Sequence, residues 1–79
     1  MGKSVLEVII SITAKHLGVS VSEVKSSSNL EDLGLNSLDL VVLIIEIEEH
    51  FDISISDTIF DTSETVEDFE KCVLSIINK

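Results

Sequence analysis

The sequence predicts an all-α fold, an irregular four-helix bundle with a long loop between the first two helices and a short third helix. Apolar residues recur at helical spacing in three long segments, stretches rich in serine or containing glycine separate them, and no proline interrupts them. A chain of 79 residues with 44% hydrophobic content can form one small core, and its single cysteine excludes an internal disulfide. We therefore expect one domain over residues 1–79, held together by aliphatic packing.

The first helix is predicted over Val5–Leu17. Ser4 and Glu7 have the spacing of a capping box at its start, and Gly18 follows its last turn, where a residue in the left-handed conformation often ends a helix. The polar residues fall on one stripe, so the opposite face, centred on Ile9, is expected to be buried.

A long connection over residues 19–36 follows. Its serines favour local hydrogen bonds over regular structure, and we expect a single helical turn around Ser22-Glu23-Val24. We interpret four apolar residues as anchors that hold this loop against the core: Val21, Val24, Leu30 and Leu33. A connection of this length usually has a role of its own, and delivering Ser37 to a fixed place is a suitable one.

The second helix is predicted over Ser37–His50. Apolar residues at i, i+3, i+4 and i+7 form its buried stripe: Leu40, Leu43, Ile44, Ile47 and Phe51. On the opposite side lie Leu38, Val42 and Ile45, with Val41 at the margin, and carboxylates surround them. An exposed apolar strip ringed by acidic residues indicates a docking face for a protein that is apolar at its centre and basic at its rim. The alternative is a helix buried all round, although isolated buried carboxylates are costly.

Two further segments complete the bundle. A short third helix is predicted over Asp57–Asp61, anchored by Ile55, Ile59 and Phe60. The last helix is predicted over Val66–Ile77, where Thr65 and Asp68 have capping-box spacing. Its buried face is expected to consist of Val66, Phe69, Val73 and Ile76.

The charge of the chain restricts its partners. Fifteen acidic residues against five lysines give a net charge of −10, which repels nucleic acid and anionic lipid and attracts basic protein surfaces. A simpler interpretation is that the acidic surface only keeps a small protein soluble. The longest apolar run, Leu40–Ile45, is too short to cross a bilayer, and Met1-Gly2-Lys3 opens no signal peptide. We expect a cytoplasmic monomer without membrane insertion.

No catalytic or metal site emerges from the pattern of titratable residues. Neither histidine has a position that predicts contact with Ser37, so the hydroxyl has no expected base. His16 is interpreted as a packing residue and His50 as a partner of helix-terminal carbonyls. Cys72 is expected to be a packed thiol. The acidic stretch from Asp52 lacks the glycine and the glutamate of a calcium loop, so we expect no metal.

The segment Leu33-Gly34-Leu35-Asn36-Ser37-Leu38-Asp39-Leu40 resembles the modification site of acyl carrier proteins, whose pattern reads roughly Leu-Gly-x-Asp-Ser-Leu-Asp. The resemblance extends from the Leu17-Gly18-Val19 helix stop to the last helix. Two positions depart from the family. Asn36 replaces the usual aspartate and keeps a capping oxygen without the charge. Val42 stands where many members carry an acidic residue, which favours a dedicated set of partners.

The resemblance implies a carrier protein and not an enzyme. A separate phosphopantetheinyl transferase, using coenzyme A and magnesium, would attach 4′-phosphopantetheine to Ser37, whose arm would then carry an acyl group as a thioester. The second helix would recognise acyl-loading, elongating and transferring enzymes through basic docking surfaces. By resemblance and from the docking face, the recognition residues would be Asn36, Leu38, Asp39, Val42, Ile45, Glu48, Glu49, Asp57 and Asp61.

Family analogy also implies that the bundle shelters an acyl chain against Leu43, Ile47, Ile59 and Phe60, the alternative being an ordinary tight core. The main interpretation is a free-standing acyl carrier protein of fatty-acid or polyketide-type synthesis. An aminoacyl or peptidyl carrier uses the same arm and stays open as an alternative. So does a helical docking adaptor without a prosthetic group, in which Ser37 is an ordinary serine at a helix start.

Self-repulsion among the acidic residues predicts a salt-dependent stability. Added salt or magnesium should raise the melting temperature, because counterions screen the net charge of −10. Thermal unfolding followed by circular dichroism across a salt series measures this. A flat or falling melting temperature would contradict the prediction.

Overall fold

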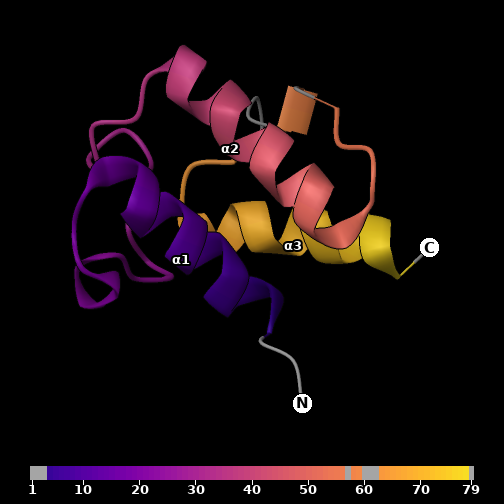
Figure 1. The fold of residues 1–79 in the computed structure, drawn as a ribbon, viewed down its shortest axis with the longest axis horizontal. Coiled ribbons are helices and arrows are strands. Elements are labelled where there is room, and N and C mark those ends of the chain that lie inside the picture. The colour runs from indigo at the N-terminus through magenta and orange to yellow at the C-terminus, as the bar shows by residue number, and fades with distance from the viewer. Residues whose placement is uncertain (1–3, 57, 60–62, 79) are drawn as a thin grey trace.

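The described part of the chain is helical. A computed structural model describes residues 4–56, 58–59 and 63–78. Its elements are α1 (Val5–Leu17), the 3₁₀ turn η1 (Val21–Glu23), α2 (Ser37–Phe51) and α3 (Val66–Ile77), as Figure 1 shows. Among these residues we find no strand, and the one isolated bridge joins Asn29 to Thr65. The predicted all-α class is confirmed.

The predicted short helix at 57–61 falls largely outside the described residues. Thr58 and Ile59 have 3₁₀ geometry, whereas Asp57, Phe60 and Asp61 are not described. Ile55 and Ile59 are buried, as expected of anchors.

Local capping explains where the helices begin and end. The Ser4 hydroxyl accepts the Glu7 amide at 3.2 Å, and Gly18 ends α1 with a φ of 75°. At α3, Thr65 Oγ1 accepts the Asp68 amide and Asp68 Oδ2 accepts the Thr65 amide, each at 3.2 Å. These bonds satisfy donors that a helix start otherwise leaves unpaired. The bounds of α1 and α3 match the prediction, and α2 continues one residue past His50.

α1 is the central element of the bundle because it packs against both α2 and α3 (Figure 1). No α-carbon of α2 lies within 8 Å of one of α3, so side chains alone fill the space between those two helices. The largest fully buried apolar side chains come from all three: Ile9, Leu43, Ile47, Val66, Phe69 and Val73. The core thus holds α2 in place from its inner face.

The connection between α1 and α2 is tied to the start of α3. The Leu30 amide donates to the Glu64 carbonyl at 2.9 Å, and the Val66 and Glu67 amides donate to the carbonyls of Ser28 and Ser26. Loop carbonyls thereby satisfy amides at the N-terminus of α3.

The predicted loop anchors are correct except for one. Val24 and Leu30 are buried and Leu33 is half-buried. Val21 is 54% exposed, so its predicted role as an anchor is wrong. It is the first residue of η1 and faces solvent, whereas Val24, just after η1, is buried. Leu35, which the prediction missed, is buried.

None of the helices in the described part of the chain is long and apolar enough to cross a membrane.

Leu43 and Leu38 offer a matched test of this packing, since both are leucines of α2 and only Leu43 is fully buried. Leu43→Ala should lower the free energy of unfolding by about 2–5 kcal/mol, because it removes buried methyl groups and leaves a cavity. Leu38→Ala should change it by less than about 0.5 kcal/mol, because Leu38 is 72% exposed. Urea unfolding followed by circular dichroism measures both. Equal losses would show that the buried face of α2 is assigned wrongly.

Candidate functional site

A capping box fixes the first turn of α2. Asn36 Oδ1 accepts the Asp39 amide at 2.8 Å, and Asp39 Oδ2 accepts the Asn36 amide at 3.0 Å. The two residues thus satisfy one another's backbone donors, as a reciprocal cap does. Asparagine keeps the capping oxygen at this position, as the sequence predicted.

Ser37 is the first residue of α2 and is exposed to solvent. Gly34, with a φ of 86°, turns the chain just before the cap, a conformation that glycine adopts without strain. The amides of the first helical turn and the positive end of the helix dipole lie beside the serine. This position suits a side chain that bears an anionic group.

His16, in the last turn of α1, contacts the first turn of α2. Its Nε2 lies 2.8 Å from Asp39 Oδ1, and the two side chains are 24% and 28% exposed. The interpretation of His16 as a packing residue is therefore wrong, because the ring bonds a carboxylate of a neighbouring helix. Its partner is Asp39 and not the Ser37 hydroxyl, so the contact supplies no base for a nucleophile.

The pKa of Asp39 is held below its ordinary value. The main cause is the hydrogen bond from the Asn36 amide, and the contact with His16 adds to it. Both interactions favour the ionised carboxylate.

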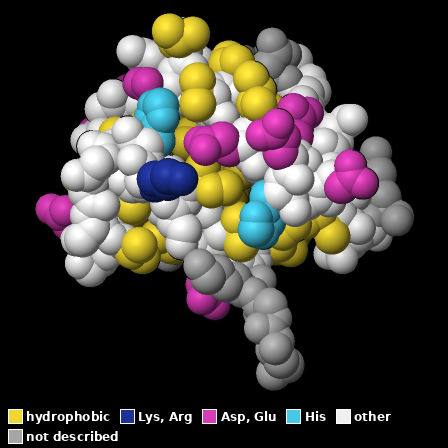
Figure 2. All heavy atoms as spheres, in the orientation of Figure 1, with side chains coloured by type: hydrophobic (Ala, Val, Ile, Leu, Met, Phe, Trp, Pro, Cys, Tyr) yellow, Lys and Arg dark blue, Asp and Glu magenta, His cyan; other side chains and the backbone are white. Residues whose placement is uncertain are grey.

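The outer side of α2 carries the predicted apolar strip. Leu38, Val41, Val42 and Ile45 are all exposed, and Ile45 is 49% exposed. Figure 2 shows hydrophobic side chains gathered over α2 at the upper edge of the molecule, with acidic side chains beside them. The alternative of a helix buried all round is excluded.

The acidic residues around the strip are arranged less uniformly than expected. Glu49 is exposed, but Glu48 is half-buried, and its Oε2 accepts the Ile55 amide at 2.6 Å. Glu48 therefore holds the segment after α2. Asp57 and Asp61, the other two acidic candidates, lie outside the described residues.

The predicted acyl-pocket residues are not gathered at one cavity. Leu43 and Ile47 are completely buried in the core, and Phe60 is not described. Ile59 lines a shallow apolar groove between residues 55–59 and α3. Ile55, Cys72 and Ile76 line the same groove.

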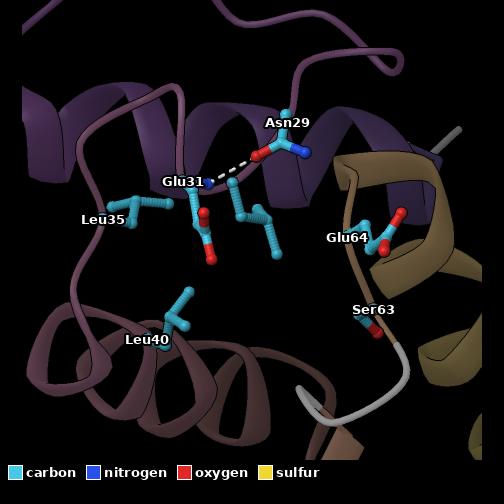
Figure 3. A pocket seen from close by; sticks show the side chains of 7 residues that line it. Asn29, Glu31, Leu35, Leu40, Ser63 and Glu64 are labelled. Carbon is cyan, nitrogen blue, oxygen red and sulfur yellow. Dashed lines mark hydrogen bonds between the residues drawn. The ribbon is translucent and has the colours of Figure 1, made fainter.

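A second cavity, of about 320 Å³, opens beside the first turns of α2. Its lining comes from the loop, from α2 and from the segment before α3: Asn29, Leu30, Glu31, Leu35, Leu40, Ser63 and Glu64. Figure 3 shows Leu35 and Leu40 reaching toward the same space, with Ser63 and Glu64 across from them. Leu35 is the second leucine of Leu33-Gly34-Leu35, and this apolar pattern is the sequence feature that identifies it.

Cys72 and His50, the other titratable residues considered from the sequence, contact neighbouring side chains. Cys72 is half-buried, with its Sγ 3.8 Å from Ser63 Oγ, which agrees with a packed thiol. His50 contacts the Phe51 ring edge-on at a centroid distance of 4.8 Å instead of capping carbonyls. Within the described ranges no cluster of His, Cys, Asp or Glu could hold a metal ion.

The lowered pKa of Asp39 predicts a pH-dependent contribution to stability. A carboxyl group whose pKa is depressed on folding stabilises the protein above its unfolded pKa, near 3.8, and the stabilisation is lost as the pH falls through the folded pKa. The destabilisation caused by Asp39→Asn should therefore be greatest above pH 5 and shrink toward pH 2. Urea titrations of both proteins across this range measure it. A pH-independent difference would contradict the assignment.

Comparison with known proteins agrees with this geometry. A family model described as the phosphopantetheine attachment site matches residues 7–73. Over 72 residues the chain is 42% identical to an acyl carrier protein from Prochlorococcus marinus (strain MIT 9515), with 90% of each chain covered. The chain therefore belongs to the acyl carrier proteins, which bear a 4′-phosphopantetheine group and carry acyl groups without being enzymes.

Proposed function

We propose that Ser37 is the residue that bears the 4′-phosphopantetheine, and that the chain presents acyl thioesters to enzymes of fatty-acid or polyketide-type synthesis. The observation that carries this proposal is the exposure of Ser37 at the capped start of α2, inside the segment that matches the family model. The family match also argues against the adaptor alternative, which has no prosthetic group.

The attachment step needs little from this chain besides presentation. Ser37 Oγ forms a bond to the β-phosphorus of coenzyme A, the bond from that phosphorus to 3′,5′-adenosine bisphosphate breaks, and a base of the transferase takes the hydroxyl proton. Amides at the start of α2 then favour the phosphodiester charge. The surroundings of Ser37 fit such a group, because the residue is exposed. The group supplies the thiol that holds the acyl chain.

The outer face of α2 is the surface proposed for partner enzymes. The exposed strip of Leu38, Val42 and Ile45 would meet an apolar centre, and Glu49 a basic rim. Asn36, Asp39, Glu48, Asp57 and Asp61 complete the proposed set, Asp39 for a partner that displaces His16 from its carboxylate. The absence of a charge at Val42 favours partners that are less basic at that point.

An acyl chain is proposed to enter from the cavity beside Leu40. Side chains alone separate α2 from α3, which supports entry of a chain between these two helices. Leu40 lies one turn after Ser37, and Leu43 and Ile47 continue the same inner face. Ile59 and Phe60 are proposed to line the far end.

Three finer expectations stay predictions: a short helix at 57–61 that completes a four-helix bundle, a single carrier domain that acts as a monomer, and a cytoplasmic setting.

Modification of two serine variants tests the attachment site. With coenzyme A, magnesium and a promiscuous phosphopantetheinyl transferase, the intact mass should rise by one 4′-phosphopantetheine. Ser37→Ala should gain nothing, while Ser27→Ala, which changes an exposed serine of the loop, should be modified like the wild type. If Ser37→Ala is still modified, the attachment site lies elsewhere.

A further inference from the structure

Both carboxylate oxygens of Asp39, two residues after the exposed Ser37, have partners within the protein. Asp39 Oδ1 contacts His16 Nε2 at 2.8 Å, and Asp39 Oδ2 accepts the Asn36 amide at 3.0 Å. The Asp39 side chain is 28% exposed, and His16 and the Asn36 amide occupy part of the carboxylate that an approaching protein would meet.

The contact between His16 and Asp39 joins two helix ends. His16 lies in the last turn of α1. Asp39 lies in the first turn of α2, where the positive end of the helix dipole favours a carboxylate.

Apart from Ser37, the exposed side chains of the first two turns of α2 are apolar. Leu38, Val41 and Val42 are exposed over the first two turns of α2. Glu48 further along is bonded to the Ile55 amide, whereas Glu49 is exposed. Twelve residues separate Ser37 from Glu49, about 18 Å along a helix.

We infer that His16 is a specificity-determining residue, which occupies the Asp39 carboxylate and withholds it from basic partner surfaces. This inference rests on the proposed function, because it concerns the partners that dock around Ser37. The partner it fits is apolar opposite the first two turns of α2 and basic near Glu49. A partner cation aimed at Asp39 has to displace the imidazole first.

A double-mutant cycle on transferase binding tests this masking. Dissociation constants are measured without coenzyme A, so that no group is transferred, for the wild type, His16→Ala, Asp39→Asn and the double variant. Masking predicts that Asp39→Asn weakens binding at least threefold more in the His16→Ala background than in the wild type, because only there is the carboxylate free. Equal effects in both backgrounds would overturn the inference.

Two further variants separate masking from a structural effect. His50→Ala removes the histidine in the last turn of α2. In this background Asp39→Asn should weaken transferase binding by the same factor as in the wild type. His16→Gln keeps an amide donor and should give an intermediate coupling. If Asp39→Asn is coupled to His50→Ala as strongly as to His16→Ala in transferase binding, the inference is overturned.

A spectroscopic readout checks the contact itself and does not depend on the modification of Ser37. Asp39→Asn should change the imidazole chemical shifts of His16 and leave those of His50 unchanged. Unchanged His16 shifts would overturn the inference even if Ser37 is modified. Failure of Ser37 to accept the group would instead contradict the proposed function and leave these shifts as predicted.

Discussion

The reciprocal hydrogen bonds between Asn36 and Asp39 fix the point at which α2 begins, and the geometry of the site depends on that point. Successive side chains of a helix point roughly 100° apart, since 3.6 residues make one turn, so the cap sets which residues lie in the first turn ahead of the buried stripe. With this start, Leu43 and Ile47 face the core while Ser37 and Leu38 face solvent. The cap at Asn36 and the buried stripe thus favour the same orientation of α2, and this orientation leaves Ser37 exposed.

The site is also coupled to the rest of the bundle through α1. α1 packs against both other helices, and His16 in its last turn reaches the first turn of α2. The loop that precedes Asn36 is held to α3 by backbone hydrogen bonds such as that from Leu30 to Glu64. These contacts hold the start of α2 from two sides, whereas α2 and α3 face each other only through side chains. The start of α2 is therefore the part of this helix that neighbouring elements hold most directly.

The helices were predictable because their signals are local. Caps such as Ser4 with Glu7 and Thr65 with Asp68 lie three residues apart, and the buried stripe of α2 follows from helical spacing. The contacts that decide the site are not local. His16 and Asp39 are separated by 23 positions, and Glu48 bonds an amide beyond the end of its helix. Sequence spacing on one helix indicates which face a side chain occupies, but not which residue of another element it meets.

Peptide-level mass spectrometry of the protein produced together with a phosphopantetheinyl transferase tests the central claim most directly. If Ser37 is the exposed attachment point at the start of α2, fragmentation will place a single 4′-phosphopantetheine on that residue. A group on any other serine, or no group while the same transferase modifies a second carrier protein, would contradict it.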